Sequence, residues 1–99
     1  MIDLDLIVGF EWDAGNARKN EKHDVSQSEA EQMFFDPRLL MVADPTHSGH
    51  EPRYHALGMT LERRYLHIAF TLRAAGTLIR VISARDMHRK ERQIYGRED

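Results

Sequence analysis

Arginine is the residue type in this chain that is best placed to do chemistry. Four arginines lie in or at the ends of segments that we expect to be strands: Arg53, Arg73, Arg80 and Arg85. A basic run over 88–92 follows the last of them. Because a guanidinium fork matches phosphate oxygens bidentately and a strand fixes the direction of a side chain, this pattern indicates a small phosphodiester-binding site.

These arginines could also have purely structural roles. Charged side chains on edge strands deter aggregation, which would account for one or two of the four. Arg80 could instead pair with a buried carboxylate such as Glu11 or Asp13 and be needed for folding. Moreover, the positions of Arg80 and Arg85 differ by an odd number, so they share a face of the strand only if it bends.

The acid–base and metal-ligating side chains give weaker signals. Lys22 and His23 end a predicted helix, where they complement its dipole, although His23 could also act as an acid–base group. Three histidines flank Glu51 in a predicted loop without the helical spacing of known zinc motifs: His47, His50 and His55. With no cysteine in the chain, thiolate metal sites are excluded, and we expect neither a metal nor another cofactor.

The net charge of −2 conceals an uneven distribution along the chain. Residues 1–50 contain four Lys or Arg and ten Asp or Glu, a balance of −6, whereas residues 51–99 contain ten and six, a balance of +4. This asymmetry suggests that the second half meets an anion or an acidic partner. Ordinary solvated surface on both halves is the simpler alternative.

The length and the N-terminal sequence bound the class of protein. A chain of 99 residues predicts one domain over 1–99 with a modest core. Acids occupy the start of the chain, where a signal peptide has a basic region, and no apolar run reaches membrane length. These features favour a cytoplasmic protein without a membrane segment.

Periodicity and capping signals predict the N-terminal elements. The even positions from Leu4 to Trp12 are apolar, which is typical of a half-buried strand over 4–12. Asp13 can then cap a helix that extends through about Lys22.

A second helix is expected to begin after Ser26. This residue forms a capping box with Glu29, and Val25 and Ala30 supply a hydrophobic staple. The helix should end before Pro37, because a proline disfavours the helical conformation of the residue before it.

Four strands and a third helix complete the prediction. The strands are expected over 39–42, 53–59, 64–73 and 77–84. A tight hairpin over 74–76 joins the last two, and Asp86 can cap the final helix, whose apolar positions are Met87, Ile94 and Tyr95. The order β-α-α-β-β-β-β-α predicts an α+β fold in which helices pack on an antiparallel sheet.

An ordered set of motifs runs through nearly the whole chain, from about 10 to 95. It comprises Phe10-Glu11-Trp12-Asp13, Asn20, Lys22-His23, Val25, Ala30, Phe34-Phe35-Asp36-Pro37, Asp44, Glu51-x-Arg53, Gly58, Thr71-x-Arg73, the run from Ile79 to Arg85, Glu91 and Tyr95. In order and spacing this set resembles the BrnT toxins of bacterial type II toxin–antitoxin systems.

The resemblance implies a RelE-like fold, with a small antiparallel sheet, two helices near the N-terminus and one at the C-terminus. It also implies a ribonuclease that inhibits translation and arrests growth. A BrnA-like antitoxin would neutralise it in an assembly with two copies of each chain. DNA would be bound by the antitoxin and by the toxin only indirectly.

Cleavage of RNA without a metal needs a base for the 2′-hydroxyl, a cation for the phosphorane and an acid for the leaving oxygen. As the phosphate clamp we expect Arg53, Arg73 and Arg80, with Arg85 in reserve. Candidates for proton transfer are His23, Lys22, Glu51 and Tyr95, which the sequence does not rank.

Two alternatives use the same basic surface without catalysis. One is a module that binds structured RNA or an acidic protein, and the other is a degenerate toxin that serves as a co-repressor subunit. Toxicity on overexpression, with and without the arginines, would separate these alternatives from a ribonuclease.

Overall fold

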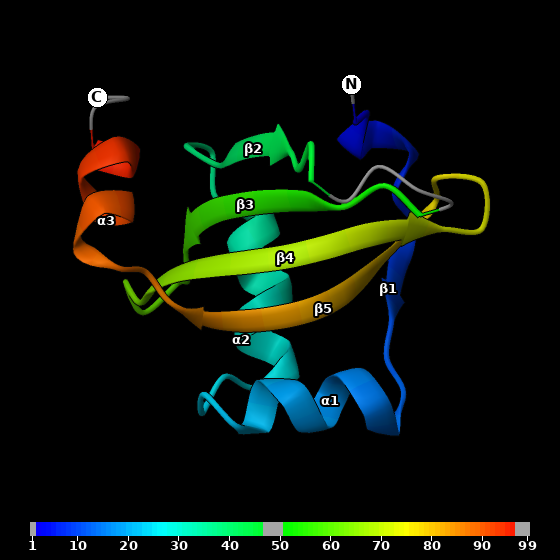
Figure 1. The fold of residues 1–99 in the computed structure, drawn as a ribbon, viewed down its shortest axis with the longest axis horizontal. Coiled ribbons are helices and arrows are strands. Elements are labelled where there is room, and N and C mark those ends of the chain that lie inside the picture. The colour runs from blue at the N-terminus through cyan, green and yellow to red at the C-terminus, as the bar shows by residue number, and fades with distance from the viewer. Residues whose placement is uncertain (1, 47–50, 97–99) are drawn as a thin grey trace.

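A five-stranded sheet organises the computed structural model, which describes residues 2–46 and 51–96 (Figure 1). The strands are β1 (Gly9–Glu11), β2 (Leu40–Ala43), β3 (Tyr54–Met59), β4 (Tyr65–Arg73) and β5 (Leu78–Asp86), in the spatial order β1-β5-β4-β3-β2. All neighbours are antiparallel except β1, which runs parallel to β5. The sheet is therefore mixed, and the expectation of a purely antiparallel sheet is wrong at this edge.

In the described part of the chain, three helices lie behind or beside the sheet. They are α1 (Ala14–Glu21), α2 (Gln27–Gln32), which a 3-10 turn extends over Met33–Phe35, and α3 (Arg89–Gly96). In Figure 1, α2 crosses the far side of the sheet, α1 lies along its lower edge, and α3 stands beside its left end. The predicted α+β order of strands and helices is confirmed, while the face toward the viewer carries no helix.

Local capping explains where the first two helices begin. Asp13 accepts hydrogen bonds from the backbone of Gly15 and Asn16 at 2.9 and 3.2 Å, and the Asn16 side chain accepts one from Asp13 N at 2.7 Å. Ser26 and Glu29 form the same reciprocal pair at 3.0 Å in each direction. Both capping predictions are confirmed, because such contacts depend on residues close together in the chain.

Two terminal predictions are wrong. The strand expected over 4–12 is observed only over Gly9–Glu11 (β1). Leu4–Leu6 form a 3-10 turn instead, and Val8 is 81% exposed. The alternation of apolar residues there does not reflect burial against one face. Asp86 does not cap α3, since it is the last residue of β5; instead His88 N donates a 2.8 Å hydrogen bond to Glu91 at the start of the helix.

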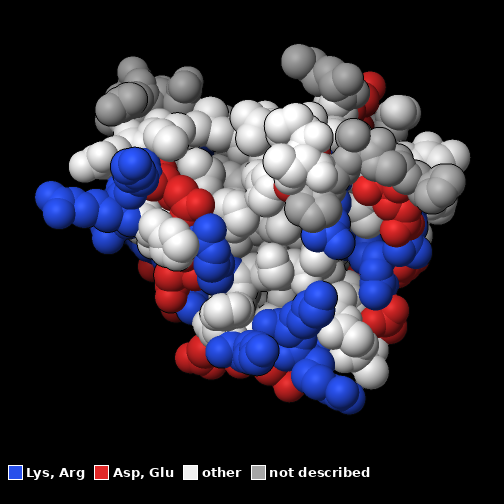
Figure 2. All heavy atoms as spheres, in the orientation of Figure 1, with Lys and Arg blue, Asp and Glu red and all other residues white. Residues whose placement is uncertain are grey.

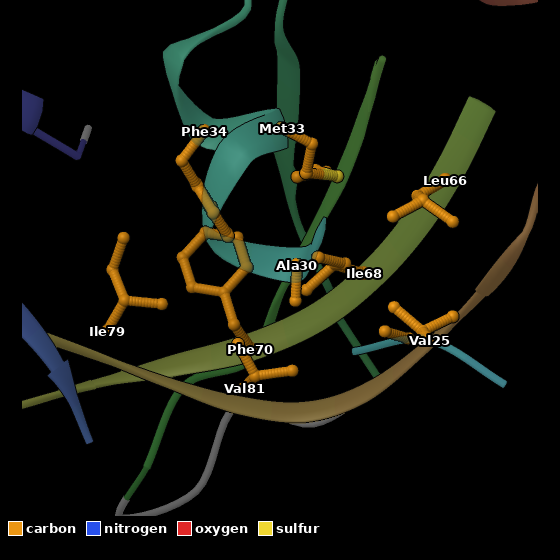
Figure 3. Close-up of a cluster of buried hydrophobic side chains, with 11 residues drawn as sticks. Val25, Ala30, Met33, Phe34, Leu66, Ile68, Phe70, Ile79 and Val81 are labelled. Carbon is orange, nitrogen blue, oxygen red and sulfur yellow. The ribbon is translucent and has the colours of Figure 1, made fainter. Parts of the chain in front are cut away.

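The core lies between α2 and the far face of the sheet, as the close-up in Figure 3 shows. Its largest contributors are Met33 and Phe34 from the helical side and Leu66, Ile68 and Phe70 from β4. The Phe34 ring meets the Phe70 ring edge-on, with the centroids 5.2 Å apart. These apolar side chains pack one face of the sheet against α2 and the 3-10 turn.

Because Gly58 on β3 packs closely against the 3-10 turn, a larger side chain at this position should destabilise the fold. A Cβ there would lie 3.0 Å from the Met33 carbonyl oxygen and 3.1 Å from Leu39 Cδ1. We expect Gly58→Ala to lower the free energy of unfolding by about 1–3 kcal/mol, since a backbone atom cannot move aside cheaply. Urea denaturation measures this loss.

Gly9→Ala on β1 is the matched control, because the added Cβ would meet only Leu78 Cδ2, at 3.5 Å. It should change the stability by less than about 1 kcal/mol. Equal effects of the two substitutions would contradict the role of packing at Gly58.

Candidate active site on the open face

The alternation of β4 divides its side chains between the core and the helix-free face, which we call the open face. Leu66, Ile68 and Phe70 point into the core, so His67 and Thr71 belong to the open face. The positions that share the open face on β4 and β5 include His67, Ala69, Thr71, Arg73, Leu78, Arg80, Ser83 and Arg85. Most of the expected phosphate clamp therefore lies on one side of the sheet.

A bulge in β5 places Arg80 and Arg85 on this same face. Phe70 pairs with Val81 and Ala69 pairs with Ser83, so Ile82 has no partner in the register. The extra residue reverses the alternation beyond it. The sequence allowed these two arginines to share a face only if the strand bends, and the bulge provides the bend.

A cavity of about 310 Å³ opens on this face where α1 meets β4 and β5. Its charged lining residues are Lys19, Glu51, Arg53, Arg73 and Arg80. We call it the arginine pocket. It brings together four residues that the sequence predicted for the site, namely Arg53, Arg73, Arg80 and Glu51.

Arg80 is held by two carboxylates at the edge of the arginine pocket. Its Nη1 atom lies 2.9 Å from Glu11 Oε1 and 2.8 Å from Asp13 Oδ2. Hydrogen bonds from Arg80 hold the pKa of Asp13 below its usual value. The two carboxylates are 33% and 56% exposed, so Arg80 pairs with the residues that the folding alternative named, although neither of them is buried.

Arg73 shares one of these carboxylates. Its Nε atom lies 2.7 Å from Glu51 Oε2, and its Nη1 atom lies 3.6 Å from Glu11 Oε1. Glu11 thus bridges Arg73 and Arg80. Within residues 2–46 and 51–96, Lys19 and Arg53 form no ion pair, so they leave uncompensated positive charge in the pocket.

The buried side chain of Asn16 fixes the wall of the arginine pocket. Its Nδ2 atom donates to Glu11 O at 2.9 Å and to Val81 O at 3.0 Å, next to the bulge. Asn16 therefore ties α1 to both β1 and β5. Neither this residue nor the bridging role of Glu11 was predicted from the sequence; the capping pair of Asp13 with Asn16 was the available signal.

The other four proposed site residues do not line the arginine pocket: Arg85, His23, Lys22 and Tyr95. Arg85 forms a bidentate pair with Glu91 at 2.8 and 2.9 Å, which lowers the pKa of Glu91 to about 2. Lys22 and His23 are exposed at the far end of α1. The Tyr95 hydroxyl donates to Asp36, and burial raises its pKa to about 12, so this tyrosine retains its proton.

The structure describes only one of the three histidines that flank Glu51 in the sequence, namely His55. His47 and His50 lie outside the described residues. Both ring nitrogens of His55 are occupied, because they lie 3.0 Å from His67 Nε2 and 2.8 Å from Asp44 Oδ2. In the described part of the chain, no three His, Asp or Glu side chains are placed to hold a metal ion.

Ion pairs between the two halves of the chain account for part of the charge asymmetry. Glu29 pairs with Arg64 at 3.2 Å, and Glu11 and Asp13 pair with Arg80. The acidic partner expected for the second half is thus in part the first half itself. Figure 2 nevertheless shows Lys and Arg side chains gathered over α3, over α1 and at the ends of β4 and β5, around a largely uncharged centre.

Comparison with protein families decides the affiliation. The family model that matches residues 12–91 is described as ribonuclease toxin, BrnT, of type II toxin-antitoxin system. The chain belongs to this family. Membership in the BrnT family makes the protein a toxin of the ribonuclease type and implies an antitoxin partner.

None of the curated proteins that were compared with this BrnT chain matches it. Across residues 2–46 and 51–96, no helix combines the length and the apolar character that crossing a bilayer requires.

The environment of His67 predicts acid sensitivity. Burial, reinforced by the charge of Arg85, lowers the pKa of His67 from 6.5 to about 4. Between these values the unfolded chain binds more protons at this site, so the free energy of unfolding should decrease as the pH falls from about 6.5 toward 4. Urea denaturation at several pH values should show a weaker decrease in His67→Gln than in the wild-type chain.

His23→Gln is the control, because His23 is exposed at the end of α1. This variant should keep the pH dependence of the wild-type chain. If both variants matched the wild type between pH 6.5 and 5, His67 would not be the source of the acid sensitivity.

Proposed function

We propose that this BrnT protein is a metal-independent endoribonuclease whose active site is the arginine pocket. The observation that carries the proposal is that Arg53, Arg73 and Arg80, from three neighbouring strands or their ends, line one cavity beside a carboxylate. Cleavage of RNA in the cytoplasm would inhibit translation and arrest growth. A RelE-like relationship of the fold remains part of this proposal.

The arginines supply the charge that the reaction requires. Arg73 and Arg80 stabilise the pentavalent phosphorane, because their positions are fixed by Glu11 before substrate arrives. Lys19 and Arg53 attract the phosphate first, since they have no ion pair among the described residues. Phosphate oxygens then replace carboxylate oxygens at the guanidinium forks.

We assign proton transfer to two other residues that line the arginine pocket, Glu51 and Lys19. Glu51 takes the proton of the 2′-hydroxyl, since its side chain is 52% exposed and, among the arginines that the structure describes, it contacts Arg73 alone. The O2′ atom attacks phosphorus, the bond to O5′ breaks, and Lys19 gives a proton to the departing oxygen. The products are a 2′,3′-cyclic phosphate and a 5′-hydroxyl, so DNA, which lacks the 2′-hydroxyl, resists cleavage.

A non-catalytic role is the second candidate, and one specific observation favours it. Arg73, Arg80 and Arg85 are already paired with carboxylates, as in a network that stabilises the fold. A module that binds RNA or protein, or a co-repressor subunit, would keep such pairs without cutting RNA.

The antitoxin partner is proposed to be BrnA-like, in an assembly with two copies of each chain. We propose that it covers the basic surface of the second half, including Arg89, Lys90 and Arg92 on α3, and thereby shields part of the RNA-binding surface. Complementary charge supports this interface, because it speeds association and orients the partners.

Loss of one guanidinium group tests the catalytic proposal. Arg80→Ala should lower RNA cleavage by at least about two orders of magnitude, the loss of roughly 3–4 kcal/mol seen when one transition-state donor is removed. The fold should persist, because ion pairs with half-exposed carboxylates contribute only about 0–1 kcal/mol. Cleavage of a labelled RNA, measured beside thermal melting, gives both readouts.

Arg63→Ala is the control, since Arg63 is exposed in a turn outside the arginine pocket, and it should cleave RNA normally. EDTA should also leave cleavage unchanged. A folded and fully active Arg80→Ala protein would refute the catalytic role. Loss of activity in EDTA that zinc or nickel restores would refute metal independence.

Competition tests the proposed antitoxin surface. RNA and the antitoxin should exclude one another from the toxin, because both are expected to use its basic surface. Fluorescence anisotropy of a labelled RNA during titration with antitoxin measures this. A stable ternary complex of toxin, antitoxin and RNA would show that the antitoxin acts elsewhere.

A further inference from the structure

A second cavity, of about 460 Å³, lies beside α3 and shares no residue with the arginine pocket. Its charged and aromatic lining residues are Arg38, Arg89, Arg92, Tyr65 and Tyr95. We call it the α3 pocket. It adjoins Tyr65 at the start of β4, whereas the arginine pocket adjoins Thr71 and Arg73 at the end of that strand.

Two guanidinium groups and two tyrosine rings contact one another in the α3 pocket, and we call them the aromatic cluster. Arg92 Cζ lies 4.9 Å from the centre of the Tyr65 ring, and Arg38 Cζ lies 5.1 Å from the centre of the Tyr95 ring. The two rings meet edge-on, with their centroids 5.8 Å apart. Contacts of this length between a cation and a ring face are attractive, so they favour these positions of the two guanidinium groups before a ligand arrives.

Burial and a hydrogen bond hold one ring of the aromatic cluster in place. Tyr95 is 2% exposed, and its hydroxyl donates to Asp36, which also accepts a hydrogen bond from Met59 N at 2.8 Å. The carboxylate that contacts Tyr95 thus accepts hydrogen bonds from two donors. Glu91, the acid on α3, is held by both Nη atoms of Arg85.

Two of the three arginines that line the α3 pocket, Arg89 and Arg92, lie on α3 itself. Within the described ranges, Arg89 and Arg92 form no ion pair, whereas Arg64, Arg73 and Arg80 each pair with a carboxylate. Arg89 and Arg92 are three residues apart on one helix, where like charges lie close together and repel. A bound anion would relieve this repulsion.

We propose that the α3 pocket is a second substrate subsite, which binds phosphates and a stacked base of single-stranded RNA several nucleotides from the cleaved bond. Guanidinium planes both stack on bases and hold phosphate, which favours single-stranded nucleic acid as the ligand. The inference rests on the proposed ribonuclease function and extends it to the part of the substrate that is not cut.

The spacing of the two pockets sets the length of the substrate. From Tyr65 to Thr71 along β4 the distance is roughly 20 Å, at the usual rise of an extended strand. Figure 1 shows the open face without a covering helix between these ends, and Figure 2 shows positive side chains at both. A trinucleotide would occupy only the arginine pocket, whereas a dodecanucleotide would reach both pockets.

Binding of RNA that cannot be cut tests this subsite directly. The probes are a trinucleotide and a dodecanucleotide in which every 2′-hydroxyl is methylated, so the nucleophile is absent. The double variant Arg89→Gln/Arg92→Gln should bind the dodecanucleotide at least about tenfold more weakly, and its affinity should depend less on salt, by about 1.4 in the logarithmic slope. Binding of the trinucleotide should be unchanged.

Arg18→Gln/Arg63→Gln is the matched control, because it removes the same charge from exposed positions outside both pockets. It should bind both oligonucleotides like the wild-type chain. Equal losses in the two double variants would overturn the proposal, since they would reflect net charge alone. In the wild-type chain, the NMR signals of α3 should shift on adding the dodecanucleotide; unshifted signals would overturn the proposal without any substitution.

The remaining outcomes separate this subsite from the proposed function. A chain that cuts no RNA but shows the expected binding would refute the ribonuclease mechanism and support the subsite. A chain that cuts long RNA equally well with and without Arg89 and Arg92, and binds it equally tightly, would refute the subsite and leave the mechanism intact. If an acidic peptide binds through these two arginines and the dodecanucleotide does not, the surface serves a protein partner and the subsite is refuted.

Discussion

The bulge at Ile82 is the constraint on which the arrangement of the active surface depends. It lets Val81 and Ala84 both enter the core although their positions differ by an odd number, and it turns Arg80 and Arg85 to the same face. Asn16 reaches the carbonyl of Val81 beside the bulge, so the same irregularity also anchors α1. A regular β5 would have sent one of the two arginines toward the core, where an unpaired guanidinium group is costly.

Ion pairs determine which arginines are fixed and which are available. Glu11 bridges Arg73 and Arg80 and thereby sets the spacing of their guanidinium groups. These carboxylates occupy the positions that phosphate oxygens would take, so a substrate must compete with the protein's own acids. The cost of that exchange is modest, because Asp13 and Glu51 are more than half exposed and water screens their pairs.

Contacts between residues near in sequence account for what could be predicted. Capping by Asp13 and Ser26 located α1 and α2, and the alternation of apolar residues over 64–73 located β4. The parallel pairing of β1 with β5 joins residues far apart in the chain, and no local pattern encodes strand direction or the position of a bulge. The residues of the arginine pocket were named largely for their position on strands, which the fold preserved.

The proposed site residues that lie outside the arginine pocket do so for a common physical reason, since residue type does not encode proximity in the fold. His23 and Tyr95 have side chains suited to proton transfer. However, His23 lies beyond the C-terminal end of α1, and Tyr95 is a buried residue of α3 whose hydroxyl donates a hydrogen bond to Asp36. Glu11 was considered only as a structural partner of Arg80, although its contact with Arg73 places it between two members of the proposed clamp.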